Sequence, residues 1–157
     1  MLQPNEQYTA TTSSLREVHL KTVILLRITS MLTAVFCAGH AYASLARLRD
    51  AGEAAVFMAM QSYKLKVLWA VRTHWDFYRG FSLLFGVTLL LLAVLLWQLS
   101  TMAKADPLAT RPMVASLLVA SLAFTVVGGM YFFFAPAVMS AAIAVCLALA
   151  LTSAKKG

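Results

Sequence analysis

Four long apolar stretches occupy most of this 157-residue chain, and they restrict it to folds that reside in a membrane. They cover residues 22–44, 77–99, 113–134 and 136–152. Each stretch is close in length to what an α-helix needs to cross a hydrocarbon core of about 30 Å, which is about 20 apolar residues. The pattern predicts an all-α protein, a four-helix transmembrane bundle.

Composition and domain size agree with a membrane protein. Hydrophobic residues make up 61% of the chain and charged residues 12%, whereas a soluble domain carries about 25% charged residues. Four spans leave little chain for a second domain, so we expect a polar N-terminal tail over residues 1–21 and a single membrane domain over 22–157. Ser13 or Ser14 is suited to cap the first span, with Glu17 three residues after Ser14. Ala41-Tyr42-Ala43 is similar to a signal-peptidase site, but Arg27 inside the apolar core favours a retained span.

The net charge of +7 indicates a lipid partner. The basic residues flank the spans, where anionic headgroups attract each of them by about 1 kcal/mol, and no nucleic-acid-binding motif accompanies them. Cys37 and Cys146 fall inside spans, where thiols behave as small hydrophobes. The histidines are far apart in sequence and no metal-ligand spacing occurs, so we expect no metal site. The sequence does not identify a cofactor.

The first connection is long and carries its own helical pattern. Apolar residues recur three or four positions apart through 54–71, which predicts an additional amphipathic helix. Such a helix can lie at the membrane interface with Trp69 and Trp75 at headgroup level, or it can form a lid over the bundle. The predicted apolar stripe consists of Val56, Met60, Tyr63, Val67 and Val71.

Four spans put both termini on one face, which we call the terminal side; the opposite face, with the first connection, is the loop side. Basic residues divide six against six, so their count does not orient the protein. Lys64 and Lys66 lie farthest from the spans and count least, which favours cytoplasmic termini. The terminal side holds Arg16, Lys21, Lys104, Arg111, Lys155 and Lys156, and the loop side Arg47, Arg49, Lys64, Lys66, Arg72 and Arg79.

Polar side chains gather toward the loop-side ends of the spans. His40 lies near the end of the first span, Asp76 and Arg79 open the second, and Tyr131 ends the third. Asp76 and Arg79 are three residues apart, so they can form an ion pair. An ionisable group inside a span is costly unless paired and marks a functional site by default. The candidate ligand-binding residues are His40, Gln61, Trp75, Asp76, Tyr78, Arg79 and Tyr131.

Each of these residues also has a structural interpretation. His40 can be a hydrogen-bonded packing residue. Asp76 and Arg79 can cap the second span, with the carboxylate at the positive helix N-terminus. Trp75, Tyr78 and Tyr131 can be interfacial aromatics.

Three short segments carry a resemblance to a known group. Together they resemble a family of small, uncharacterised bacterial four-helix membrane proteins, similar in layout to the DoxX-like proteins. The resemblance implies a bundle in the bacterial inner membrane and no particular activity. The segments are Gly39-His40, Met60-Gln61-Ser62 and Trp75-Asp76-Phe77-Tyr78-Arg79-Gly80-Phe81.

Three function classes remain, ranked as follows. The first is an accessory protein, which holds a small apolar ligand in a polar-tipped pocket or supports a membrane complex. The second is a membrane enzyme acting on a lipid or sterol-like substrate, with His40 as general base. No Glu lies in any span, and a cation beside Asp76 favours its charged form, which weakens the enzyme hypothesis. The third is a small multidrug-type exporter, which relies on an acidic residue that the first span lacks.

Overall fold

The structure, a computed structural model, describes residues 4–45 and 51–154. In this part of the chain, four helices are long and apolar enough to cross a membrane, the first of them over His19–Leu45. Their positions confirm the predicted all-α four-helix membrane domain. The four are α1 (Pro4–Leu45), α3 (His74–Met102), α4 (Arg111–Tyr131) and α5 (Phe134–Ser153).

The additional helix in the first connection is present, but it is shorter than predicted. Helix α2 covers Ala51–Ser62, and the rest of the predicted segment forms an antiparallel hairpin of β1 (Lys64–Val67) and β2 (Ala70–Thr73). The helical prediction was therefore wrong beyond Ser62. The physical reason is that Lys64 to Val67 alternates polar and apolar residues, a period of two that fits a strand.

The predicted apolar stripe of this helix is confirmed at Met60 and was wrong at Val56. The half-buried positions of α2 are Ala54, Phe57 and Met60, whereas Val56 is exposed. The stripe that packs is offset because α2 rests on the start of α3, with the ring of Phe57 at 4.6 Å from that of Trp75.

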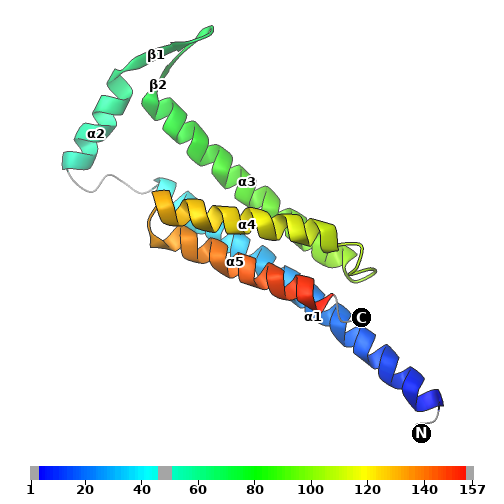
Figure 1. Ribbon diagram of the computed structural model, residues 1–157. Helices are drawn as coiled ribbons and strands as arrows, with labels where there is room; N and C mark the ends of the chain where they lie inside the picture. Colours follow the sequence, from blue (N-terminus) through cyan, green and yellow to red (C-terminus); the bar gives the residue numbers. More distant parts are fainter. Residues whose placement is uncertain (1–3, 46–50, 155–157) are drawn as a thin grey trace.

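Helix α1 is longer than the span within it. Its 42 residues correspond to about 63 Å at 1.5 Å per residue, twice the hydrocarbon thickness. The helix begins at Pro4, a residue suited to a first turn. Ser13 and Ser14 therefore lie within the helix and not at its start, so the predicted capping position was wrong. The N-terminal part of α1 extends beyond the other spans at the terminal side (Figure 1).

Helices α4 and α5 form a tight antiparallel hairpin. Only Phe132 and Phe133 connect them, both extended, so the link lies slightly before residue 135, which separates the predicted spans 113–134 and 136–152. Pro136 lies in the first turn of α5, where its missing N–H has no intrahelical role. A Cβ on Gly128 would come within 3.3 Å of the backbone nitrogen of Ala137. The absence of a side chain there lets the two backbones approach closely.

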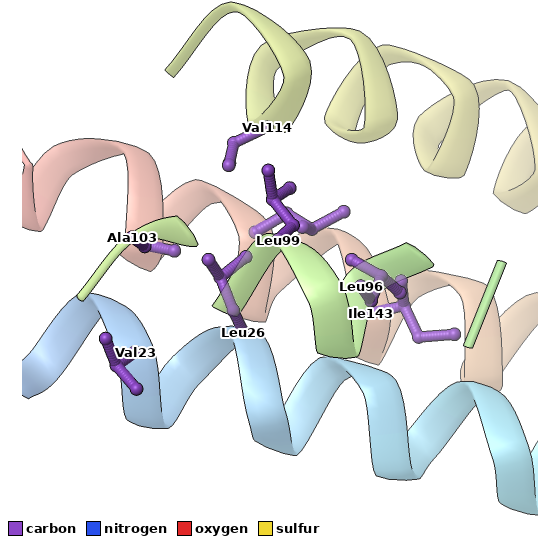
Figure 2. Close-up of a cluster of buried hydrophobic side chains, with 9 residues drawn as sticks. Val23, Leu26, Leu96, Leu99, Ala103, Val114 and Ile143 are labelled. Atoms are coloured by element: carbon purple, nitrogen blue, oxygen red, sulfur yellow. The ribbon is translucent and has the colours of Figure 1, made fainter. Parts of the chain in front are cut away.

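The hydrophobic core lies in the terminal-side half of the bundle (Figure 2). There α1, α3 and α5 meet, and the start of α4 covers them. The core consists of Val23, Leu26, Leu96, Leu99, Ala103, Val114, Ile143, Leu147 and Ala150.

Helices α1 and α3 pack along one continuous antiparallel seam. On both helices the seam positions recur at alternating steps of three and four residues, the repeat of coiled coils. Small and polar residues dominate it, which permits close backbone approach inside a membrane. Ser30 Oγ donates to the Ala93 carbonyl over 2.7 Å, and Cys37 Sγ lies 3.4 Å from the Gly86 carbonyl. The stripe on α1 is Val23, Leu26, Ser30, Thr33, Cys37, His40 and Ser44, and on α3 it is Ser82, Gly86, Leu89, Ala93, Leu96 and Ser100.

Candidate functional site

His40 is a titratable side chain inside the first span. It is half-buried at the loop-side end of the seam, and its Nε2 lies 2.9 Å from the Ser82 carbonyl oxygen. A carbonyl can only accept, so Nε2 carries the proton in this contact. In the neutral ring Nδ1 is then the acceptor, and among the described residues it has no hydrogen-bond partner.

An aromatic chain leads from His40 across the bundle. The ring of Phe85 on α3 contacts the His40 ring edge-on, with 5.0 Å between centroids. Phe85 in turn meets Phe124 of α4 at 6.1 Å and Phe36 of α1 at 6.0 Å. His40 thus contacts the Phe85 ring, which is part of this aromatic chain, and the backbone carbonyl of Ser82.

Two serines complete the polar surroundings of His40. Ser44 Oγ donates to the His40 carbonyl over 2.8 Å and lies 2.9 Å from Ser82 Oγ. Ser82 Oγ is also 3.3 Å from His40 Nε2. Sequence reasoning missed Ser82, which belongs to the regular seam stripe of α3, and Phe85, which lies next to that stripe.

Asp76 caps α3. Its Oδ2 accepts from the Thr73 backbone N–H over 2.8 Å and from Thr73 Oγ1 over 3.0 Å. In return the Asp76 N–H donates to Thr73 Oγ1 over 3.2 Å, which completes a capping box. No ion pair between Asp76 and Arg79 occurs in the described structure. The structural interpretation of Asp76 therefore fits its contacts, and the expected pair with Arg79 is not formed.

Trp75 and Tyr78 belong to an aromatic group at the start of α3. Their rings stack with centroids 5.5 Å apart, and Trp75 also meets Phe57 of α2. Tyr63, just before β1, stacks on His74 at 5.5 Å. These contacts fix α2 and the hairpin against the first turns of α3, and they do not reach His40.

The other candidates do not join the environment of His40. Gln61 and Arg79 are exposed, and Tyr131 is 75% exposed at the end of α4. Asp76 precedes Ser82 by six residues on α3, about 9 Å along the helix. The candidates thus share one side of the membrane, but the structure divides them between the α1–α3 seam, the α3 cap and the exposed ends of helices.

One surface depression does not include any of the candidate residues. It measures about 420 Å³ and lies between residues 30–38 of α1 and Trp97 of α3. Arg27 stacks over the Trp97 ring at 5.0 Å, and its Nε has no hydrogen-bond partner. The depression is lined by Ser30, Met31, Ala34, Val35, Ala38 and Trp97, so it has no titratable group of its own.

Metal coordination has no support in the described residues, which contain no group of three His, Cys, Asp or Glu able to hold an ion. Comparisons with family models, with curated proteins and with solved structures find no match to this chain. The resemblance to DoxX-like proteins therefore stays a prediction, and the functional argument depends on the geometry of the chain itself.

Proposed function

We propose that this polytopic membrane protein is an accessory protein that holds a small apolar molecule beside His40. The observation that carries the proposal is the state of that histidine: it is half-buried in a span, one ring nitrogen is fixed by a carbonyl, and the other has no partner. A polar atom without a partner in an apolar environment is costly. A bound molecule that donates a hydrogen bond to Nδ1 would remove that cost.

The shape of α3 supports the same proposal. From His74 to Thr88 none of its residues is buried, whereas its second half supplies much of the core. The N-terminal half of α3 also leans away from α4 (Figure 1). Apolar side chains of both helices, among them Phe81 and Met130, are left uncovered by protein on this side. An apolar ligand can therefore reach the loop-side half of α3 from the bilayer.

The two ring nitrogens of His40 restrict the class of ligand. Nε2–H is engaged with Ser82, so the neutral ring offers only an acceptor at Nδ1. The ligand is then an apolar molecule that carries a hydroxyl or an N–H group. The Phe85 ring, which itself contacts Phe36, supplies an apolar contact to the His40 ring.

Native mass spectrometry of the gently purified protein tests the proposal. We expect a co-purifying small molecule on the wild type and on His74→Leu, because His74 lies outside the spanning seam on the same side of the membrane. His40→Leu should lower its occupancy about tenfold, the equivalent of one hydrogen bond of about 1.4 kcal/mol. Circular dichroism should confirm that both variants fold. Equal occupancy in the His40 and His74 variants, or no bound molecule in the wild type, would reject the proposal.

A membrane enzyme is the second candidate, because the same fixed tautomer also presents Nδ1 as a base. His40→Gln separates the two functions. Glutamine can still donate to a carbonyl and accept from a ligand, but it does not take up a proton near neutral pH. A binding protein should keep its ligand in this variant, whereas an enzyme should bind the substrate and lose turnover.

The cellular location and orientation are also proposals. The resemblance in layout to DoxX-like proteins supports the bacterial inner membrane. The remote position of Lys64 and Lys66 supports cytoplasmic termini. A reporter that is active only in the cytoplasm tests this orientation when it is fused at the C-terminus or inserted within residues 46–50. We expect activity only in the C-terminal fusion.

A further inference from the structure

The β1–β2 hairpin has an apolar tip that nothing in the described chain covers. We define the tip as residues 67–71, Val-Leu-Trp-Ala-Val, five consecutive apolar residues around the turn. Leu68 is 75% exposed and Trp69 is 92% exposed, and Val67 and Val71 are exposed as well. In Figure 1 the hairpin turn points away from the four spanning helices.

A basic collar surrounds the tip. Lys64 and Lys66 lie on β1, and Arg72 on β2 pairs with Leu65 in the strand register. Cross-strand partners share a face of the sheet, so the two lysines lie on one face and Arg72 on the other. No Asp or Glu occurs between Glu53 and Asp76. The collar itself contains only cations, and it reaches both faces of the hairpin. The nearest acid is Asp76, whose carboxylate interacts with Arg72.

The turn keeps a bulky residue where backbone geometry favours glycine. Leu68 has a φ of 53° and is the one positive-φ residue other than glycine in the described chain. It occupies the first position of a two-residue hairpin turn, a place that glycine usually takes when φ is positive. A leucine at such a position is disfavoured by about 1–2 kcal/mol. The apolar side chain is therefore present despite a backbone cost, which points to a contact that the isolated chain does not make.

The hairpin is fixed to the membrane domain. Thr73, its last residue, is also the N-cap of α3, so no linker separates β2 from the span. The Tyr63–His74 stack ties the chain just before β1 to the first residue of α3 as well. The hairpin is therefore fixed at the loop-side end of a span, and its tip is not free to fold onto the bundle core.

From these observations we infer that the hairpin inserts its tip into the loop-side leaflet of the protein's own bilayer, with the collar on anionic lipid phosphates. The dimensions fit this arrangement. At about 3.3 Å per residue, Lys66 lies about 7 Å and Lys64 about 13 Å from Leu68 along the strand. An apolar interfacial element sinks about 5–10 Å into the headgroup and acyl boundary. The tip would then lie below the phosphates and the cations level with them.

Trp69 fluorescence tests this inference directly. The variant Trp75→Phe with Trp97→Phe leaves Trp69 as the single tryptophan. In nanodiscs that contain an anionic lipid, we expect lipids brominated near the top of the acyl chain to quench it and the aqueous quencher acrylamide to reach it several-fold less than free tryptophan. The difference in quenching between the wild-type protein and Trp69→Phe also reports on Trp69, and it leaves Trp75 and Trp97 unaltered.

Two further variants separate the contribution of the cations from that of the apolar side chains. Replacing Lys64, Lys66 and Arg72 by Gln should reduce quenching by the brominated lipids at least twofold, as should nanodiscs of zwitterionic lipid or 1 M salt, where the screening length falls to about 3 Å. Leu68→Gly relieves the positive φ while removing an apolar side chain, so it should reduce insertion without lowering the melting temperature. Trp69 lies in the hairpin and His40 in α1. The quenching experiment therefore tests insertion of the tip, and native mass spectrometry tests ligand binding separately.

Either of two results would overturn the inference. Full access of acrylamide to Trp69 in anionic nanodiscs would mean that the tip stays in water. Protection from acrylamide without quenching by brominated lipid would mean that protein covers the tip, either a second copy or another membrane protein.

Discussion

The terminal-side half of the bundle is packed as a core, whereas the loop-side half is held by one seam and one hairpin. On the terminal side α1, α3 and α5 share buried leucines, with Leu26 at 0% exposure. On the loop side α3 keeps contact with α1 through Cys37, His40 and Ser44, and none of its residues from His74 to Thr88 is buried. Helix α3 is thus part of the core in its C-terminal half and has no buried residues in its N-terminal half.

The difference assigns separate tasks to the two halves. Core packing in the terminal-side half supplies most of the stability of the bundle, because dispersion and close fit drive helix association in lipid. The loop-side half contributes less packing and is therefore free to present His40, the exposed aromatics and the hairpin to ligands or lipid. A region with few buried contacts is also the place where local opening is easiest.

The largest effect should come from the packed half. Leu26→Ala removes a fully buried side chain, and we expect a loss of about 2–5 kcal/mol in the free energy of unfolding, as in other tightly packed cores. Phe81 is 69% exposed on the loop-side half of α3. Phe81→Ala should therefore change the free energy of unfolding by less than about 0.5 kcal/mol. Thermal unfolding in detergent measures both. Equal losses would show that the loop-side half is packed as firmly as the core.

A smaller effect should come from the close backbone approach of α4 and α5 on the loop side. Gly128→Leu would push a side chain against the Ala137 backbone, and overpacking of this kind costs about 1–3 kcal/mol. Its neighbour supplies a matched control, since a Cβ on Gly129 meets nothing within 4 Å. Both substitutions gain the same helix propensity, so a difference in melting temperature reports the α4–α5 contact alone. Two equally stable variants would mean that these helix ends separate readily.

The smallest effects should come from Asp76 and Arg79. Asparagine still accepts from Thr73, so Asp76→Asn should cost less than about 0.5 kcal/mol. The double variant with Arg79→Gln should be additive to within about 0.5 kcal/mol, because the two residues form no ion pair. Thr73→Val removes the capping hydroxyl and should cost about 1 kcal/mol. A coupling above 1 kcal/mol between Asp76 and Arg79 would instead show a charged pair that stabilises the loop side.

Some of the candidate site was within reach of sequence reasoning. Ser30, Cys37 and Ser44 recur at intervals of seven in the first span, and Gly86, Ala93 and Ser100 recur likewise in the second. Two such stripes of small residues predict an antiparallel seam, and His40 falls on it. The hairpin was harder to predict, because Val67 and Val71 fit both a helical stripe and a strand, and the tertiary contacts of Tyr63 and Phe57 decided between them.

The sequence by itself determined that the chain crosses a membrane four times, because about 20 apolar residues in a row satisfy both the bilayer thickness and the hydrogen bonds of a helical backbone. It also determined that the polar candidates share one side. Only the tertiary structure decided which of them meet. In lipid the hydrophobic effect does not select helix neighbours, so rotation and tilt follow from side-chain fit between helices. That fit placed His40 against Ser82 and Phe85, paired Asp76 with Thr73, and left Gln61, Arg79 and Tyr131 at exposed helix ends.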